Sequence, residues 1–213
     1  MLSIRDRTGA SRQRIDKHPA YREWEDIAFS QFGLAAMSHR GGVFGLPGSA
    51  HPVAKYALVY LFVQAEFGLC CPLSMMDSLT RTLRRFGSQE LQGRYLAGLT
   101  TQDMDALLQG AMFMTAKVAG SDVGAITTEA WPRDGEWRLY GTSGSAPIPM
   151  GGWRWCWPGP RAGAGTRGLS LFLMPRDLPD GTPNAIRILR LKNKMCTRSM
   201  ASGEVTLDGA VGA

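Results

Sequence analysis

One stretch of the chain combines the residue types that bind phosphate groups or the polar edge of a heterocycle. Residues 111–128 read AMFMTAKVAGSDVGAITT, in which an apolar, strand-like run passes into small and hydroxyl-bearing residues. A turn of this composition exposes backbone N–H groups and Ser or Thr oxygens, which can meet a negatively charged ligand. A plain junction between a strand and a loop has the same composition, and from composition alone that interpretation is the better one.

A second glycine-rich stretch, residues 163–168, has the spacing GxGxxG. A dinucleotide-binding fingerprint needs a strand before these glycines and a helix after them. Here a strand-like run follows and no helix does, so the sequence predicts a hairpin loop. The sequence shows no recognisable catalytic triad or carboxylate pair, and its four cysteines and three histidines lack the spacing of zinc ligands.

The formal net charge of +6 indicates a modestly basic protein. Such an excess allows weak attraction to nucleic acid or acidic lipid. The basic residues are interspersed, however, and their densest run, residues 187–198, is more typical of the solvated face of a strand. The apolar stretch from Tyr56 to Val63 is too short to span a bilayer, and the polar N-terminus does not resemble a signal peptide. We expect a cytoplasmic protein that does not span a membrane.

Two kinds of structure must position these stretches, because the composition changes near residue 110. The first part shows helical periodicity, which predicts helices over residues 21–37, 54–67, 72–85, 89–97 and 103–108. The second part has short apolar or alternating runs between Gly and Pro, which predict strands at residues 136–140, 169–174, 184–191 and 204–208. The predicted architecture is α+β, with an all-α domain over residues 1–110 and a β domain over residues 111–213.

Four blocks of the sequence, in this order, resemble the acyl-CoA dehydrogenase family. Residues 114–124 read MTAKVAGSDVG, which is similar to the family's MTE-x-x-x-GSDV signature, and the other blocks are residues 165–176, 184–194 and 197–205. Two further segments, residues 18–21 and 66–74, resemble the alkylation-response (AidB-like) branch in particular. The resemblance covers the chain from residue 15 to its end, and four ordered blocks make it far more specific than one motif.

The resemblance implies an N-terminal helical domain, a middle barrel-like β domain and a C-terminal helical bundle, with FAD between the last two. It implies that Met112, Met114 and Thr115 lie at the flavin edge. Gly120 and Ser121 are implied at the FAD pyrophosphate, with Ser121 also near the acyl-CoA. The implied activity is the α,β-dehydrogenation of an acyl-CoA thioester, with FAD as the hydride acceptor. These roles agree with the interpretation of residues 111–128 as a phosphate-binding turn.

The chain departs from the family pattern in several places. It ends at Ala213, where the resemblance implies the start of the C-terminal bundle. That bundle carries the family's catalytic carboxylate, much of the interface of these homo-oligomers and the DNA contacts of the AidB-like branch. Ala116 replaces the usual glutamate of the signature, and Cys196 stands where the family usually has glycine. We therefore assign no catalytic residue, and we expect this chain by itself to be inactive and not to assemble as the family does.

A further departure covers residues 142–161. Where the family has HKWF followed by an apolar strand, this chain has TSGSAP and later WRWCWPG. Reading each codon one base earlier lets the first segment encode HKWFCS and the second an apolar run, because tryptophan has a single codon. We hypothesise compensating frame shifts near Gly141 and Arg161, with a natural Trp-rich loop as the alternative. The β domain is then expected to lose or misplace a strand, with Arg154 at the surface.

Two other interpretations stay open beside the enzyme. One is a non-catalytic flavin- or nucleic-acid-binding protein of the AidB-like type, whose affinity for DNA would fall steeply with salt. The other is a degraded gene product, which would show low solubility and no cooperative unfolding. Bound FAD distinguishes the flavoprotein from the degraded product, and reduction of that FAD by an acyl-CoA distinguishes the enzyme from both.

Overall fold

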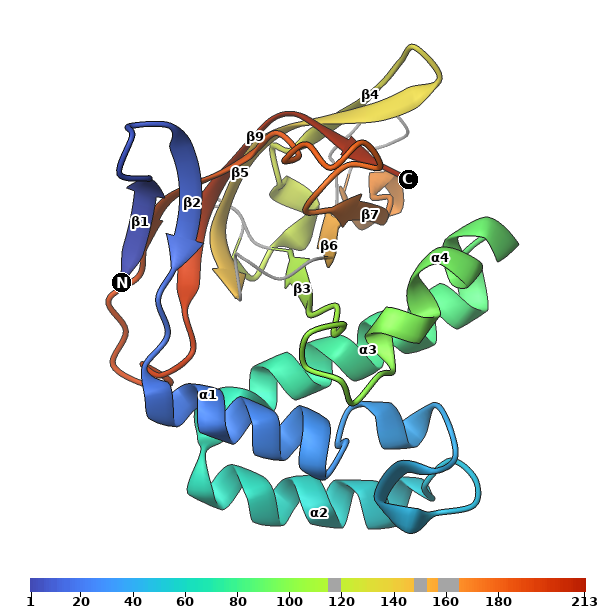
Figure 1. Cartoon of the computed structure of the whole chain (residues 1–213). Coiled ribbons are helices and arrows are strands. Elements are labelled where there is room, and N and C mark those ends of the chain that lie inside the picture. Colours follow the sequence, from blue (N-terminus) through green and yellow to red (C-terminus); the bar gives the residue numbers. More distant parts are fainter. Residues whose placement is uncertain (115–119, 148–152, 157–164) are drawn as a thin grey trace. The chain divides into compact units, whose positions relative to one another are not determined.

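The structure, a computed structural model, describes residues 1–114, 120–147, 153–156 and 165–213 (Figure 1). The chain divides into two compact units. The sheet unit comprises Met1–Asp16, Ala111–Asn193 and Ala201–Ala213, and the helical unit comprises Lys17–Gly110 and Lys194–Met200. The chain therefore passes between the units several times, and each unit contains segments that are distant in sequence.

The helical unit contains α1 (Pro19–Glu25), α2 (Pro52–Ala65), α3 (Cys70–Phe86) and α4 (Gln89–Leu99). A π-helix (Asp26–Gln31) continues α1, and short 3-10 turns occupy Ala36–Ser38, Val43–Gly45 and Phe67–Leu69.

Local caps explain where three of these helices begin. Pro19 and Pro52 open α1 and α2, at positions whose N–H groups would have no helical partner. His18 and His51 precede these prolines, and each Nδ1 accepts a hydrogen bond from the backbone N–H two residues later. Ser88 caps α4: its Oγ accepts from the Leu91 N–H at 3.2 Å.

The predicted helix over residues 21–37 is wrong after Phe32. The helical segment ends by Phe32, because Gly33 has a φ of 58°, which a right-handed helix cannot continue through. A Cβ added to Gly33 would also lie 2.5 Å from the Val43 side chain. The predicted helix over residues 103–108 is likewise wrong. Thr101 Oγ1 does accept from the Asp103 N–H at 3.1 Å, but only a turn follows.

The core of the helical unit includes one face of α3. Four buried residues of α3 recur every three or four positions, which is the spacing of a single helix face: Leu73, Met76, Leu79 and Leu83. α2 is attached differently, because its only fully buried residues are Lys55 and Phe62, two turns apart. Phe62 contacts Trp24 edge-to-face, with ring centroids 5.6 Å apart. The fully buried side chains of α2 are therefore confined to one narrow strip of the helix surface.

The strands of the sheet unit lie in three sheets (Figure 1). β1 (Leu2–Arg5) and β2 (Ser11–Ile15) form an antiparallel hairpin. A four-stranded antiparallel sheet has the order β4 (Glu129–Arg133), β5 (Glu136–Pro147), β9 (Ser202–Gly212) and β8 (Ile186–Leu191). A three-stranded sheet has the order β3 (Gly110–Phe113), β6 (Trp153–Cys156) and β7 (Phe172–Pro175).

These sheets confirm a mixed helix and sheet fold but correct two expectations. The described strands form separate sheets and do not close into a barrel. No strand is lost at these residues, because Trp153–Cys156 forms β6 and pairs with β7, while Thr142 and Ser143 continue β5 against β9. That a strand is misplaced stays a prediction. The Arg154 side chain lies outside the described part. The frame-shift hypothesis concerns the nucleotide sequence and stays a prediction.

A bilayer crossing requires a helix that is both long and apolar. None of the helices in the described ranges meets that requirement.

Asn184 fastens β7 and β9 with all four hydrogen bonds of its buried amide. Its Nδ2 donates to the carbonyl oxygens of Pro175 and Val211, at 2.8 and 2.9 Å. Its Oδ1 accepts from the N–H groups of Ala185 and Val211, at 2.9 and 2.8 Å. An amide has two donor hydrogens and two acceptor lone pairs, so this side chain is fully satisfied.

Gln13 in β2 pairs with the edge of β8 in a similar way. Its Nε2 donates to the Ile186 carbonyl at 2.7 Å, and its Oε1 accepts from the Ile188 N–H. β8 is the last strand of its sheet, so no other described strand pairs with these backbone groups. The glutamine amide therefore takes the place of a strand backbone and covers part of an exposed edge.

The connection between β8 and β9 belongs to the helical unit. In this connection, Lys194–Met200, the Ser199 hydroxyl donates to Glu66 Oε1 at 2.7 Å. The same oxygen accepts from the Gly68 N–H at 2.7 Å. A Cβ added to Gly68 would lie 2.1 Å from Ser199 Oγ, so this close approach needs glycine at position 68.

Candidate flavin-binding segment

The residues that the resemblance assigns to FAD lie on β3 and on the segment after it. In β3, Ala111 and Phe113 are buried and Met112 is half-buried, since alternate side chains of a strand point to opposite faces. Met114 follows the strand and is also half-buried. Thr115 lies outside the described residues, together with residues 116–119. The predicted flavin edge is thus described at Met112 and Met114 only.

Gly120 and Ser121, the predicted pyrophosphate contacts, are both exposed. A Cβ built on Gly120 would meet no heavy atom of the described residues within 4 Å, so these residues leave the space beside this backbone open. Directly after them, Asp122 Oδ1 accepts from the Gly124 N–H at 3.1 Å and caps the 3-10 turn Val123–Ala125. That cap gives the chain a defined turn immediately after Ser121.

The segment returns to the four-stranded sheet through a close backbone approach. Thr128 is buried just before β4, and Gly141 lies within β5. Gly141 has a φ of 144°, and an added Cβ would lie 2.8 Å from both the Cα and the Oγ1 of Thr128. Any other residue at position 141 would be strained and would displace Thr128. This approach fixes the end of the 111–128 segment against the sheet.

The described residues of this segment fit a phosphate-bearing cofactor. The open space beside Gly120 allows a ligand to approach the backbone closely. The exposed Ser121 hydroxyl can donate a hydrogen bond to a phosphate oxygen. Met112 and Met114 offer the soft, polarisable surface that suits contact with an aromatic ring. Whether β3 and the Gly120–Ser121 turn meet around one flavin stays a prediction, because residues 115–119 join them.

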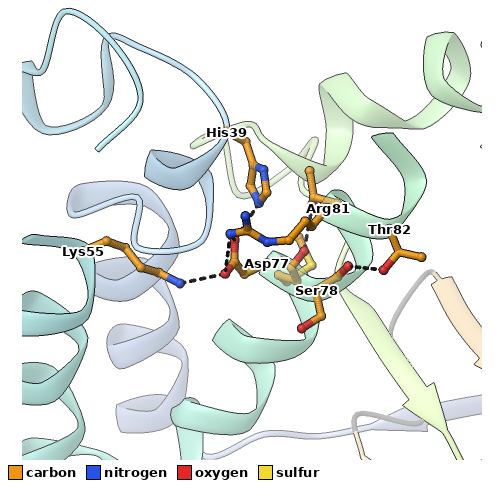
Figure 2. A network of polar contacts seen from close by, with 8 residues as sticks. His39, Lys55, Asp77, Ser78, Arg81 and Thr82 are labelled. Carbon is orange, nitrogen blue, oxygen red and sulfur yellow. Dashed lines mark hydrogen bonds and ion pairs between the residues drawn. The ribbon is translucent and has the colours of Figure 1, made fainter. Parts of the chain in front are cut away.

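A second polar cluster, in which basic side chains surround Asp77 in the helical unit, was not predicted from the sequence (Figure 2). Lys55 Nζ lies 3.0 Å from Asp77 Oδ2, His39 Nε2 lies 2.7 Å from Oδ1, and Arg81 Nη2 lies 3.3 Å from Oδ1. The side chains of His39, Lys55 and Asp77 are at most 7% exposed, whereas that of Arg81 is 63% exposed. Asp77 is therefore a buried carboxylate that joins α2, α3 and the turn at His39.

The surroundings of Asp77 stabilise its charged form. Burial raises the pKa of this carboxyl group, but the hydrogen bonds and positive charges of His39 and Lys55 outweigh burial and hold the pKa well below its usual range. Lys55 Nζ also lies 4.4 Å from the centroid of the Tyr56 ring.

This arrangement is suited to holding α2, α3 and the turn at His39 together, and not to catalysis. A general acid or base has to reach a substrate, whereas His39, Lys55 and Asp77 are buried against one another. They come from separate elements, so no sequence pattern links them. Only the spacing of Asp77 and Arg81, four residues apart on α3, is readable from the sequence.

Comparisons with known proteins agree with this architecture. Residues 1–106 match the family model of the adaptive response protein AidB N-terminal domain. The chain is 35% identical, over 175 residues, to the putative acyl-CoA dehydrogenase AidB of Escherichia coli (strain K12). The aligned region covers 75% of this chain and 30% of that protein. It is 29% identical, over 211 residues, to acyl-CoA dehydrogenase family member 11 of Caenorhabditis elegans, covering 93% of this chain and 34% of that protein. The chain thus spans about a third of the length of these curated relatives.

Solved structures show the same fold. Caenorhabditis elegans ACDH-11 in complex with C11-CoA is similar at a TM-score of 0.83 and 25% identity, over 99% of this chain and 37% of that one. A glutaryl-CoA dehydrogenase from Mycobacterium smegmatis in complex with FADH2 is similar at a TM-score of 0.69 and 20% identity, over 90% of this chain and 47% of that one. Fold and sequence together define an acyl-CoA dehydrogenase family protein. Within that family, the chain belongs to the AidB-like branch.

Proposed function

We propose that this chain binds FAD and an acyl-CoA thioester and serves in the α,β-dehydrogenation of that thioester. Family membership is the observation that carries the proposal. The fit of the described residues 112–114 and 120–121 to a phosphate-bearing cofactor supports it. The two ligand classes are those of related structures, namely C11-CoA in ACDH-11 and FADH2 in glutaryl-CoA dehydrogenase.

The proposal assigns binding roles to five residues. Met112, Met114 and Thr115 contact the edge of the flavin, and Gly120 and Ser121 contact the pyrophosphate. Ser121 also contacts the acyl-CoA. FAD, when bound, supplies the acceptor for the hydride that leaves the acyl β-carbon. The chain's own residues bind and orient the ligands, and we assign proton removal to none of them.

We also propose that the two parts of the chain on either side of residue 110 have different roles. Residues 111–213 then carry the cofactor contacts, and the helices of residues 1–110 carry none of them. The open space beside Gly120 supports this assignment, because a phosphate contact needs a backbone that no side chain covers.

Titration of the purified chain with FAD, followed by quenching of flavin fluorescence, tests the binding role. Ser121→Asp places a negative charge where the pyrophosphate is expected, and should weaken FAD binding by at least about tenfold. Ser170→Asp adds the same charge at another exposed serine of the sheet unit and is the matched control. Equal binding by the two variants would exclude this role of Ser121, and an unsubstituted chain that binds no FAD would contradict the proposal.

Binding of C11-CoA, measured by calorimetry on the FAD-loaded chain, tests the substrate class. We measure binding rather than turnover, because no catalytic residue is assigned. Ser121→Asp should also weaken this binding, since the thioester carries phosphate groups of its own. A chain that binds FAD but not C11-CoA would be a flavoprotein with a different substrate.

A further inference from the structure

Three Asp–Gly bonds occur in the sheet unit, at Asp134–Gly135, Asp180–Gly181 and Asp208–Gly209. An Asp–Gly bond is chemically weak, because the backbone nitrogen of the glycine can attack Cγ of the aspartate and glycine has no Cβ to hinder that approach. The residue pair is the same at all three places, but the fold holds the three bonds in different ways. Their surroundings therefore decide which of them reacts.

The Asp134–Gly135 bond lies at the tip of the hairpin of β4 and β5 (Figure 1). Arg133 pairs with Glu136, so the turn consists of these two residues, whose φ angles are 53° and 81°. The Asp134 side chain is 85% exposed, and the Arg133 guanidinium that lies 3.7 Å from it is itself 71% exposed. Among the described residues, none accepts a hydrogen bond from the Gly135 N–H. The attacking nitrogen and the attacked carboxyl group are thus both free to move.

The Asp180–Gly181 bond is also exposed, but hydrogen bonds hold both of its reacting groups. Asp180 Oδ1 accepts from the Thr182 hydroxyl at 2.6 Å and from the Thr182 N–H at 2.9 Å. The Gly181 N–H donates to the Leu178 carbonyl at 2.9 Å. The hydrogen bonds from Thr182 also lower the pKa of the Asp180 carboxyl group, which disfavours the neutral acid from which the ring closes.

The Asp208–Gly209 bond lies within β9, where strand pairing holds the backbone. Asp208 pairs with Tyr140 of β5, and its N–H donates to the Ala185 carbonyl at 3.2 Å. Ring closure has to rotate the peptide group between the two residues towards the aspartate side chain. An extended and paired strand opposes that rotation.

We propose that Asp134–Gly135 is a site of spontaneous succinimide and isoaspartate formation. The Gly135 nitrogen loses its proton, bonds to Asp134 Cγ and displaces hydroxide from it, so that one water leaves. Addition of one water to the ring then restores aspartate when the bond between Cγ and the nitrogen breaks. It gives isoaspartate when the bond between the backbone carbonyl carbon of Asp134 and the nitrogen breaks. Water is the only co-reactant, and the site is independent of the proposed FAD contacts.

Isoaspartate at position 134 lengthens the hairpin turn by one backbone atom, because the chain then runs through Cβ and Cγ. The length of a hairpin turn sets the register of its strands, so the neighbouring pair of Arg133 and Glu136 should loosen first. The product also carries a free α-carboxylate at an exposed turn. That group is the substrate of isoaspartyl methyltransferases, which esterify it with S-adenosylmethionine, so we expect such a repair enzyme to act on this turn.

Incubation of the whole folded chain at mildly acidic pH, followed by peptide mass spectrometry with electron-transfer dissociation, tests the proposal. Isoaspartate at residue 134 should exceed that at residues 180 and 208 by at least about fivefold, the factor that one hydrogen bond of ordinary strength represents. In urea the fold no longer holds these bonds, so all three should react at similar rates.

Two variants and one enzyme assay sharpen the test. Asp134→Glu requires a larger ring and should abolish both the product at residue 134 and most of the methyl transfer by an isoaspartyl methyltransferase. Thr182→Val removes the hydroxyl that bonds Asp180 and should raise isoaspartate at residue 180 by about fivefold. Circular dichroism shows that each variant is folded.

Three results would overturn the proposal. One is as much isoaspartate at residue 180 or 208 of the folded chain as at residue 134. Another is a folded chain that forms none at residue 134 although the chain in urea does. The third is a preference for residue 134 that persists in urea, because the local sequence and not the fold would then set the order.

Discussion

Asp77 in the helical unit and Asn184 in the sheet unit are both buried polar side chains that join distant segments, but they do so with different chemistry. Asp77 is an anion held by a lysine, a histidine and an arginine. Asn184 is neutral, and its partners are backbone groups: the Pro175 and Val211 carbonyls and the Ala185 and Val211 N–H groups. The first arrangement depends on protonation, and the second does not.

The difference follows from what each kind of element leaves unsatisfied. An α-helix satisfies its backbone hydrogen bonds internally, so helices can be cross-linked mainly through side chains. Strand ends and loops leave backbone N–H and C=O groups that need partners when they are buried. An amide matches those groups in number and geometry, whereas a carboxylate would face the two carbonyls with no hydrogen to donate.

Replacement of Asp77 should have the largest effect on stability. Asp77→Ala leaves Lys55 buried without its counter-charge, and removing one partner of a buried ion pair costs about 3 to 5 kcal/mol. Arg81→Ala, which removes the exposed partner of the same carboxylate, should cost less than about 0.5 kcal/mol. Urea unfolding followed by circular dichroism measures both. Equal losses would show that burial does not set the strength of this network.

Replacement of Asn184 should come next. Asn184→Ala leaves four backbone groups without their partner, which should lower the free energy of unfolding by about 2 to 4 kcal/mol. Asn184→Asp has nearly the same shape but loses both donors, so we expect a loss of similar size. Hydrogen exchange at the Val211 and Ala185 amides should accelerate in Asn184→Ala, and less in Asn184→Asp, which keeps the oxygen that accepts from both N–H groups. An Asn184→Asp variant as stable as the unsubstituted chain would contradict the role of the two donated bonds.

Lowering the pH should distinguish the Asp77 network from the Asn184 hydrogen bonds, because only Asp77 gains a proton. The pKa of Asp77 is lower in the folded chain than in the unfolded chain, so the folded state binds fewer protons. This carboxylate therefore contributes stability above about pH 4, and the contribution is lost as the pH falls further. In unfolding measurements at neutral pH and at about pH 3, Asp77→Asn should flatten the acid loss and Asn184→Ala should keep it. An unchanged acid loss in Asp77→Asn would assign it to other carboxylates.

Replacement of Gln13, whose amide is partly exposed, should have a smaller effect than replacement of Asp77 or Asn184. Gln13→Ala should lower stability by about 1 kcal/mol and speed hydrogen exchange at Ile188. Gln13→Glu keeps an acceptor for the Ile188 N–H and loses the donor to Ile186, so it should protect Ile188 better than Gln13→Ala does. Equal exchange in the two variants would show that the accepted bond contributes nothing.

Much of the secondary structure could be predicted because local chemistry sets it. α2 begins at Pro52 and α4 follows Ser88, where proline geometry and a serine cap act within one turn. The pair Asp134–Gly135 is typical of a tight hairpin turn, and both residues have positive φ. The hairpin β1–β2 was not predicted, because its strands are polar and its contact with β8 pairs Gln13 with residues far along the chain.

The candidate site shows the same limit. The family motif identifies Gly120 and Ser121, since the order of residues carries that information. The approach of Gly141 to Thr128 requires a known φ and the pairing of β4 with β5. The Asp77 network requires the positions of three separate elements. Contacts of this kind could not be predicted from single residues, because their partners are defined only by the fold.

Because Lys194–Met200 belongs to the helical unit, this polypeptide cannot be divided cleanly at one point of its sequence. A cut at residue 110 would give two pieces that match the change in composition, yet neither piece would keep all of its own unit. The first piece would lose the serine that bonds Glu66, and the second would lose the glutamine that shields β8. We therefore expect neither piece to fold by itself as a complete unit.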